Sequence, residues 1–519
     1  MLRQTFVVFV LLALAAMVIV VAGASSVASA GGDTHDLVDP TPPPPDVPAN
    51  PYGAYFTPRL LYGETLRDAD ALWTTIFLNW RDVEKTPSEY DWSKWDEALG
   101  RATDLGYQVV VTINGNPTWA AETSCGPIRQ EYLDDFATFV RKAVERYSYP
   151  PFNVRFWAFY NEPDNSDAVN WGGYLGGCWG FAWNPNAAPG AGGAAYANML
   201  KHVYPAVKAA NPEALVVMGG LAYDWFTTDV DFPGIFDPWF LEDVVKAGGA
   251  DYFDYLNFHY YPWSAYVHWE PDGANRYERH LAYKARWIVT EVYNLTGERK
   301  PIMITETGET SYNKDGVPDY HRQIWVLFET FMHSRMVKAY PILWFTASDA
   351  IRTSDGRKFG LLHEDGTPKP SYFAYKTLVE ELKEAEFVRP RDDLPMRFEG
   401  YVFNDRGRMK QVLWMYPDEN FPPPQPQDLP VSQPGGSMRI VRVKNNPIND
   451  QDLDIVSESV VTDGGQGDYD GIVNGKIRVM ITEDYQFFED LSQPQYTPTP
   501  TPTVTPTPHI DLFLPVFYN

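Results

Sequence analysis

Cysteine is almost absent from the sequence: Cys125 and Cys178 are the only two in 519 residues. Two cysteines cannot complete a structural zinc site by themselves, and no histidine cluster with ligand spacing accompanies them. In an exported chain, an even pair of cysteines favours a disulfide, with two free thiols as the alternative. We therefore expect a Cys125–Cys178 disulfide, no metal ion and no cofactor.

Positive charge is also scarce. The 42 lysines and arginines are outnumbered by 68 aspartates and glutamates, so the net charge is −26 and the sequence pI is about 4.7. Nucleic acids and anionic membranes are bound by basic patches, so the charge balance argues against both as partners. The charge balance fits a soluble protein that acts on a neutral substrate.

Long hydrophobic runs are missing except at the N-terminus. Arg3 precedes an unbroken apolar run from Phe6 to Val21, and Ala28-Ser29-Ala30 has the form of a cleavage site. This pattern is typical of a signal peptide over residues 1–30, with a retained membrane anchor as the alternative. The apolar segment Leu512–Tyr518 is too short to cross a bilayer. We expect an extracellular or cell-surface protein with no membrane-spanning segment after cleavage.

Proline-rich segments flank the rest of the chain. Residues 31–50 form a polar leader that contains the run Thr41–Pro45, and residues 491–519 hold a Thr/Pro stalk that ends in a short apolar tail. Such compositions cannot pack into a core. The tail resembles those that attach exported proteins to a cell envelope, and a frayed terminus is the alternative.

Residues 51–385 alternate short β-branched or aromatic runs with amphipathic stretches, which predicts repeated βα units and a parallel sheet. The expected strands are Tyr52–Phe56, Trp73–Asn79, Gln108–Ile113, Val154–Tyr160, Leu215–Met218, Tyr255–Phe258, Ile302–Thr305 and Ala339–Phe345. The expected helices are Ser93–Leu105, Tyr132–Tyr147, Ala195–Ala210, Pro238–Ala247, Tyr277–Tyr293, Tyr320–Ser334 and Ser371–Lys383. Eight units in this length predict an α/β fold of the (β/α)8 TIM-barrel type. A doubly wound open sheet is the alternative, but no Gly-rich phosphate turn follows the first strand.

The pattern changes after residue 385. Five short strand-like runs between Gly400 and Ile481 are separated by Gly, Asn, Asp and Pro turns, and no good helix is present. Residues 386–490 are therefore expected to form a small all-β, β-sandwich-like domain.

Two of the expected barrel strands run directly into glutamates. Strand four leads into Asn161-Glu162-Pro163, and strand seven leads into Thr305-Glu306-Thr307-Gly308. Active sites of such barrels lie at the carboxyl ends of the strands, so Glu162 and Glu306 can face one cleft. Two carboxyl groups about 5–5.5 Å apart perform retaining glycoside hydrolysis, whereas about 6.5–9.5 Å gives inversion.

These two motifs resemble those of the clan A glycoside hydrolases, with family 39 or family 5 as the nearest patterns. Three further stretches agree with the resemblance, and they are Trp80–Glu84, Asn116–Trp119 and Gly360–Pro370. The resemblance covers most of residues 51–385. It implies a retaining β-glycosidase in which Glu306 is the nucleophile and Glu162 is the general acid/base.

Other residues are expected to contact the carbohydrate substrate. The resemblance implies that Asn161 donates to the sugar 2-hydroxyl and that Tyr261 steadies the nucleophile; structural roles are the alternatives. Both His259 and Tyr261 can face the cleft, since side chains alternate along a strand. Trp344 is expected to be the stacking surface for the sugar. The weaker candidates for the cleft are Trp119, Trp80 and Arg81.

Two other functions remain open on these residues. A transglycosylase would use the same glutamates and pass the glycosyl group to another sugar, and a non-catalytic carbohydrate-binding or cell-surface protein would keep the fold without turnover. The sugar, the linkage and the choice between exo and endo cleavage are not specified by the sequence.

Overall fold

The computed structural model describes residues 37–56, 62–166, 177–180, 188, 190–223, 235–262, 280–313, 315–351, 356–395, 397–416 and 426–493. The expected signal peptide and nearly all of the Thr/Pro tail lie outside the described residues, so these two expectations stay predictions. Within the described part of the chain, no helix is both long enough and apolar enough to cross a membrane.

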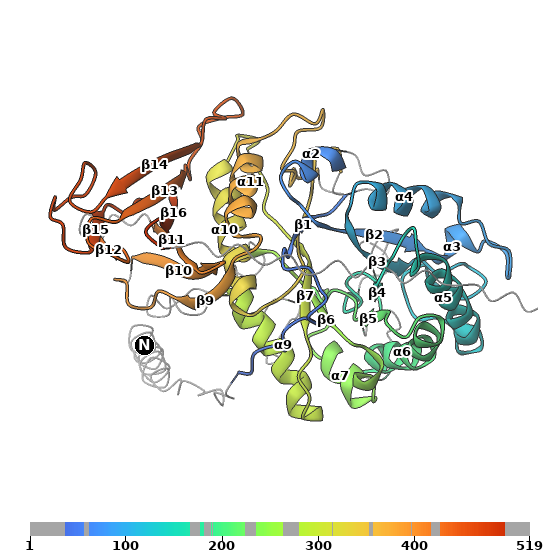
Figure 1. Cartoon of the computed structure of the whole chain (residues 1–519). Helices are drawn as coiled ribbons and strands as arrows, with labels where there is room; N and C mark the ends of the chain where they lie inside the picture. Colours follow the sequence, from blue (N-terminus) through green and yellow to red (C-terminus); the bar gives the residue numbers. More distant parts are fainter. Residues whose placement is uncertain are drawn as a thin grey trace, which may run out of the picture. The chain divides into compact units, whose positions relative to one another are not determined.

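The first domain is built on an eight-stranded parallel sheet with the strand order β5-β4-β3-β2-β1-β8-β7-β6 (Figure 1). Its strands are β1 (Tyr52–Ala54), β2 (Trp73–Asn79), β3 (Gln108–Asn114), β4 (Phe156–Phe159), β5 (Leu215–Val217), β6 (Leu256–Tyr260), β7 (Ile302–Thr307) and β8 (Ile342–Trp344). The end strands β5 and β6 meet through isolated parallel bridges, Val217 to Tyr255 and Leu221 to Phe258, which close the sheet into a barrel. The predicted TIM barrel is confirmed.

The barrel strands are apolar on both faces because one face fills the interior and the other lies beneath helices. Every residue of β2 is buried, for example. The interior is filled by side chains from different strands, and this cluster comprises Trp73, Val110, Phe156, Ala158, Val217, Tyr255, Met303 and Leu343. The barrel is therefore packed through, and reactive groups can gather only at its ends.

Helices follow most of the strands. They are α2 (Gly63–Arg67), α3 (Trp80–Val83), α4 (Ser93–Asp104), α5 (Leu133–Tyr147), α6 (Ala191–Ala210), α7 (Phe240–Lys246), α9 (His280–Thr296), α10 (Tyr320–Met336) and α11 (Pro370–Leu382). Their bounds agree with the expected helices to within a few residues. The short helices α2 and α3 precede α4, and α3 was not expected.

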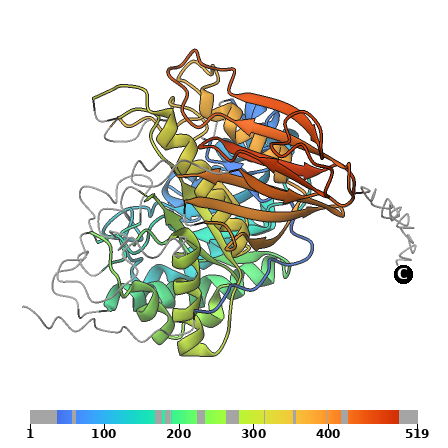
Figure 2. The same cartoon turned by 90° about the vertical axis from the view of Figure 1, so that its left-hand side faces the viewer.

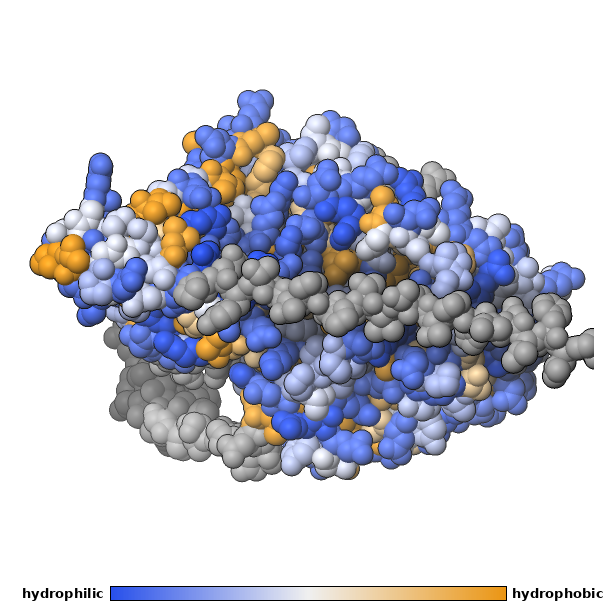
Figure 3. Space-filling view, in the orientation of Figure 1, coloured by the Kyte–Doolittle hydropathy of each residue, from blue (hydrophilic) through white to orange (hydrophobic). Residues whose placement is uncertain are grey.

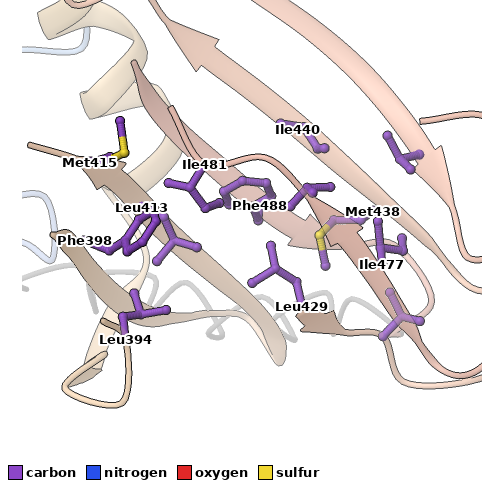
Figure 4. Packing of buried hydrophobic residues seen from close by; sticks show 13 residues of the cluster. Leu394, Phe398, Leu413, Met415, Leu429, Met438, Ile440, Ile477, Ile481 and Phe488 are labelled. Carbon is purple, nitrogen blue, oxygen red and sulfur yellow. The ribbon is translucent and has the colours of Figure 1, made fainter. Parts of the chain in front are cut away.

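The second domain is antiparallel. It comprises β9 (Glu386–Pro390), β10 (Phe398–Asp405), β11 (Arg408–Met415), β12 (Gln427–Pro430), β13 (Ser437–Val443), β14 (Val456–Thr462), β15 (Lys476–Val479) and β16 (Tyr485–Asp490). Six of these strands form one sheet in the order β14-β13-β16-β11-β10-β9, while β12 pairs with β15. Thirteen buried side chains, including Leu413, Leu429, Ile477 and Phe488, form a shared core between them (Figure 4). The expected small β domain is confirmed.

The other face of the six-stranded sheet lies against α10 and α11 (Figure 2). The Tyr485 ring stacks on Phe328 of α10 at 3.8 Å, and Lys410 pairs with Glu381 of α11 at 3.2 Å. Because side chains alternate along a strand, Met438 enters the core of the β domain while Arg439 reaches Glu381. The sheet is therefore buried on both faces where it covers the barrel helices.

Exposed apolar side chains concentrate on the second domain (Figure 3). Seven of the large exposed hydrophobic residues belong to one part of it, and these are Ile448, Leu453, Val456, Val460, Tyr469, Ile472 and Val473. Most of them are separated by polar side chains along the chain, which is ordinary for a protein surface.

Candidate active site

Glu162 and Glu306 lie at the carboxyl ends of β4 and β7. Glu306 is the fifth of six residues in β7, and Glu162 follows the last residue of β4, Phe159, by three positions. The chain takes left-handed backbone conformations at Tyr160 (φ 60°) and Glu162 (φ 48°). Such conformations cost free energy for residues other than glycine and persist only where the surroundings enforce them.

Packing around Tyr160 supplies that enforcement. Its buried ring lies edge-on to Trp179 at 4.8 Å, and its hydroxyl donates to Asn116 Oδ1. Asn116 in turn donates from its amide to the carbonyls of Thr123 and Gly126. The loop after β3 therefore holds the turn that presents Glu162.

The disulfide between Cys125 and Cys178 is present, as predicted. It joins the loop after β3 to the segment Gly177–Gly180, which runs alongside the Glu162 turn. Backbone hydrogen bonds from Gly177 to Asn161 and from Trp179 to Pro163 fasten this segment on both sides of Glu162. The disulfide thus anchors the backbone that carries Glu162. Most of the expected cleft wall Asn165–Trp183 lies outside the described residues.

An imidazole stands between the two carboxylates. His259 Nδ1 lies 3.0 Å from Glu162 Oε1 and 3.6 Å from Glu306 Oε2. Carboxylate oxygens of the two glutamates and the imidazole nitrogen all lie within 4.8 Å of one another. This separation belongs with the short spacing of retaining glycosidases, about 5–5.5 Å between carboxyl groups, rather than the long spacing of inverting ones.

The protons around His259 can be assigned from its neighbours. The backbone N–H of Thr305 donates to Asn257 Oδ1 at 3.2 Å, which identifies that atom as the amide oxygen. The Thr305 hydroxyl, 3.0 Å from the same oxygen, must also donate to it. The hydroxyl oxygen therefore accepts from His259 Nε2, 3.1 Å away.

This assignment leaves His259 Nδ1 facing Glu162 Oε1 with one proton between them. Either Glu162 is protonated and donates to a neutral imidazole, or the imidazole is charged and donates to the carboxylate. Burial lowers the pKa of His259, but Glu306 and Glu162 outweigh that effect, so the pKa is raised. The raised pKa of His259 favours retention of the proton that lies between His259 and Glu162.

Tyr261 forms a hydrogen bond with Glu306. Its hydroxyl donates to Glu306 Oε2 at 2.9 Å, and burial together with Glu306 raises the pKa of Tyr261 well above its usual value. The hydroxyl consequently remains a donor. Burial raises the pKa of Glu306, and both the imidazole of His259 and the Tyr261 hydroxyl act in the opposite direction.

Histidine, cysteine, aspartate and glutamate side chains can hold a metal ion when three of them lie close together. In the described part of the chain, Glu162, His259 and Glu306 form the only such group. Both ring nitrogens of His259 already have hydrogen-bonding partners, Glu162 and Thr305. A hydrogen-bonded pair of carboxylates around an imidazole accounts for the same geometry without assigning it to a metal.

The expected stacking surface needs a correction. Trp344 is fully buried, and its indole N–H donates to the Phe359 carbonyl, so neither face of the ring can contact a sugar. The neighbouring Phe345 is partly exposed and lies edge-on to Tyr261, with ring centroids 6.2 Å apart. Phe345 thus takes the position that the sequence analysis gave to Trp344, because adjacent side chains of a strand point in opposite directions.

Trp80 was also placed wrongly in the cleft. It is fully buried, its indole N–H donates to Glu84 at 2.7 Å, and its ring packs against Trp119 at 5.1 Å. Trp119 itself is partly exposed and donates to the Glu84 carbonyl. This cluster supports the loops after β2 and β3.

Arg81 and Asn161 remain accessible. Arg81 lines a pocket of about 290 Å³ together with residues of the loop after β3, among them Asn116 and Glu122. Asn161 is partly exposed and immediately precedes Glu162, and its backbone carbonyl accepts from Gly177. The structure therefore brings Asn161, Glu162, His259, Tyr261 and Glu306 together, but not Trp344 or Trp80.

A closed eight-stranded barrel with two glutamates at the ends of its fourth and seventh strands has the architecture of a clan A glycoside hydrolase. Residues 74–348, more than half of the chain, match the family model described as Cellulase (glycosyl hydrolase family 5). The chain belongs to glycosyl hydrolase family 5 and is a glycoside hydrolase. The motifs of the chain resemble those of families 39 and 5, and the family model supports family 5.

Several solved structures share the fold of this chain. A family 39 glycoside hydrolase from Bacteroides cellulosilyticus WH2 has a TM-score of 0.58 and 19% identity, covering 85% of this chain and 81% of that one. A monomeric β-xylosidase from Caulobacter crescentus CB15 has a TM-score of 0.56 and 16% identity, covering 87% and 97%. A GH30 endoxylanase from Clostridium papyrosolvens C71 has a TM-score of 0.52 and 12% identity, covering 88% and 98%. At these identities the likeness concerns the fold. No curated protein matches the chain.

Proposed function

We propose that this chain is a secreted retaining β-glycosidase that hydrolyses O-glycosidic bonds of a poly- or oligosaccharide by double displacement. Glu306 is the nucleophile and Glu162 is the general acid/base. The observation that carries the proposal is the short separation of the two carboxylates, with oxygens of Glu162 and Glu306 within 4.8 Å. No water can stand between carboxylates this close and attack from the far side of the sugar.

The first step forms a glycosyl-enzyme. A carboxylate oxygen of Glu306 bonds to the anomeric carbon while the bond from that carbon to the leaving oxygen breaks, and Glu162 gives its proton to the leaving oxygen. In the second step Glu162, now ionised, takes a proton from water, and the water oxygen displaces Glu306. The enzyme returns to its starting protonation, and the anomeric configuration is retained.

The neighbours of the two glutamates fit these roles. The proton that lies between His259 and Glu162 is available to the acid/base for the first step. The Tyr261 hydroxyl favours the ionised form of Glu306, which the nucleophile requires. Asn161 stands beside Glu162 and can donate to the sugar 2-hydroxyl, and Phe345 offers a partly exposed ring beside Tyr261.

Secretion is part of the proposal on two grounds. Residues 1–30 have the pattern of a signal peptide, and the chain contains a disulfide, which is stable in oxidising compartments. We place the enzyme outside the cell or at its surface. Attachment to a cell envelope through the C-terminal tail is a further expectation of the sequence.

The decisive experiment follows the anomeric configuration of the first product by NMR. Aryl β-xylosides and β-glucosides are the first substrates to screen, since solved structures of similar fold include a β-xylosidase and a glucosidase. Retention is expected, and a product of inverted configuration would overturn the mechanism. Adding an acceptor sugar to the same reaction distinguishes hydrolysis from transglycosylation, because a transglycosylase then yields mainly the acceptor glycoside. A folded protein that turns over no glycoside would be a carbohydrate-binding protein instead.

A further inference from the structure

A buried lysine lies where the barrel closes. Lys284 of α9 is fully buried, and its Nζ donates to the His259 carbonyl at 2.8 Å and, more weakly, to the Leu221 carbonyl at 3.5 Å. His259 belongs to β6, and Leu221 follows β5. Between these two strands the barrel is joined by isolated bridges rather than by a continuous ladder. Lys284 thus bonds to both sides of the closing seam.

A buried carboxylate, that of Asp164, lies near the same seam and contacts the residues that follow β5. Asp164 follows Glu162 by two residues, and its Oδ2 accepts from the backbone N–H groups of Ala222 and Tyr223 at 3.0 and 2.9 Å. Burial raises the pKa of Asp164 to about 7, the two backbone donors and Lys284 lower it, and Glu162 raises it. The Lys284 ammonium and the Asp164 carboxyl therefore influence each other within one buried region.

These contacts form a closed circuit that begins and ends at Glu162. Glu162 bonds to the His259 ring, and the His259 carbonyl bonds to Lys284. Lys284 also donates to the Leu221 carbonyl. Ala222 and Tyr223, which follow Leu221, donate to Asp164, and Asp164 lies two residues after Glu162 in the chain. We call this set the seam circuit.

The seam circuit has little room to relax. Gly220 lies directly against the His259 ring, and a Cβ atom at Gly220 would be 2.2 Å from Nε2. The His259 backbone N–H also donates to the Leu221 carbonyl at 2.9 Å. A shift of Leu221 or of its neighbours would therefore move the imidazole, and with it the hydrogen bond to Glu162.

We propose that Lys284 and Asp164 are positioning residues for the acid/base, and that through them the closure of the barrel between β5 and β6 holds Glu162 against His259. This inference rests on the proposed role of Glu162. Lys284 acts through the His259 backbone, and Asp164 acts through the turn that follows Glu162.

Loss of either residue should impair proton donation more than nucleophilic attack. General acid assistance matters when the leaving group is a poor one, and an activated aryl leaving group departs without a proton. A merely structural role would lower turnover of all substrates alike. The dependence of kcat/KM on the acidity of the leaving phenol therefore separates the two possibilities.

The experiment compares aryl β-glycosides of one sugar, from dinitrophenyl to unsubstituted phenyl, for the full-length wild type, Lys284→Met, Asp164→Ala and Asp164→Asn. Lys284→Met and Asp164→Ala should lower kcat/KM at least about tenfold for the phenyl glycoside and less than about threefold for the dinitrophenyl glycoside. Asp164→Asn should stay close to wild type, because one amide oxygen can accept both backbone N–H groups.

Two controls make the result decisive. Lys410→Met removes another buried lysine, which forms ion pairs with Glu381 and Asp405 and has no contact with Glu162 or Glu306. This variant should leave the dependence of kcat/KM on the leaving group unchanged. Glu162→Ala should show the steepest dependence. If Glu162→Ala is steep while the folded Lys284→Met and Asp164→Ala variants are flat, the seam circuit has no positioning role and the proposed function stands. If Glu162→Ala is itself flat, Glu162 is not the acid, and both proposals fail. Should Lys284→Met not fold, the contrast between Asp164→Ala and Asp164→Asn carries the test.

Discussion

Tyr261 donates a hydrogen bond to Glu306, with 2.9 Å between the hydroxyl oxygen and Oε2. Tyr261 follows the last residue of β6, and Glu306 lies one residue before the end of β7. Because β6 and β7 pair in parallel, the two side chains reach the same edge of the barrel. The contact places a fixed donor on the carboxylate that must stay ionised to act as a nucleophile.

The Tyr261 hydroxyl should set the acid limb of the pH profile. Burial raises the pKa of Glu306 above its ordinary 4.5, so activity is lost as pH falls through a value higher than that. The hydroxyl opposes the rise, and Tyr261→Phe should therefore move the acid limb of kcat/KM to still higher pH. The measurement is kcat/KM for one aryl glycoside across the acid range.

The matched control for this prediction is Tyr55→Phe. Tyr55 stacks on Phe345 and is buried near Glu306, but within the described part of the chain its hydroxyl makes no hydrogen bond to that carboxylate. Its acid limb should coincide with that of the wild type. An unmoved limb in Tyr261→Phe would show that the hydroxyl does not tune Glu306.

Replacing the nucleophile should abolish turnover without loss of the fold. Glu306→Gln keeps the shape of the side chain and a hydrogen-bonding partner for Tyr261, but the amide cannot form the glycosyl-enzyme. We expect kcat to fall at least about a thousandfold, as is usual when the nucleophile is removed. The melting temperature should stay near the wild-type value. Full activity in this variant would refute the assignment of Glu306.

Replacing the acid/base should leave a defect that a small anion can repair. In Glu162→Ala, an activated aryl glycoside still forms the glycosyl-enzyme, but no base then activates water. Azide needs no base and should raise the rate, giving a β-glycosyl azide that NMR can identify. The same azide should have no effect on Glu306→Gln, which forms no intermediate. Equal behaviour of the two variants would contradict the division of roles between the glutamates.

The sequence predicted the barrel well because its signals are local. Two of the apolar strand runs lead directly into Glu162 and Glu306, so the placement of both glutamates at one end of a barrel required only strand counting. The Cys125–Cys178 disulfide could be inferred because these are the only two cysteines of a chain that begins with the pattern of a signal peptide.

Contacts across the closing seam could not be predicted in this way. Lys284 is an ordinary lysine on a helix until the barrel closes and buries it between Leu221 and His259. The face of β8 that fronts the cleft depends on the register against β7, and an error of one residue exchanged Phe345 for Trp344. Adjacent side chains of β8 must point to opposite faces of the sheet, but the sequence does not specify which of the two faces the cleft.

Phe345 should contribute to substrate binding, and Trp344 should not. Phe345→Ala removes a partly exposed ring beside Tyr261, and a lost stacking contact of about 0.5–1.5 kcal/mol would raise KM by a factor of about 2 to 13. Trp344→Phe instead leaves a gap in a fully buried region and should lower the melting temperature while KM stays unchanged. An increase in KM for Trp344→Phe alone would restore the original assignment of the stacking surface.

The disulfide should stabilise the site as well as the fold. Cys125 and Cys178 are 53 residues apart, and in the chain-entropy account a crosslink of that span contributes about 4 kcal/mol, with about 2–4 kcal/mol usual in practice. The double variant Cys125→Ser with Cys178→Ser should therefore unfold at a lower urea concentration, with a slope no smaller than that of the wild type because the unfolded chain is no longer crosslinked. Because Gly177 and Trp179 bond to the backbone on either side of Glu162, local loosening should also lower kcat for phenyl glycosides below the melting transition. Dithiothreitol should reproduce both effects in the wild type and change nothing further in the double variant. A wild type that keeps its stability and its kcat after complete reduction would show that the disulfide does not anchor the Glu162 turn.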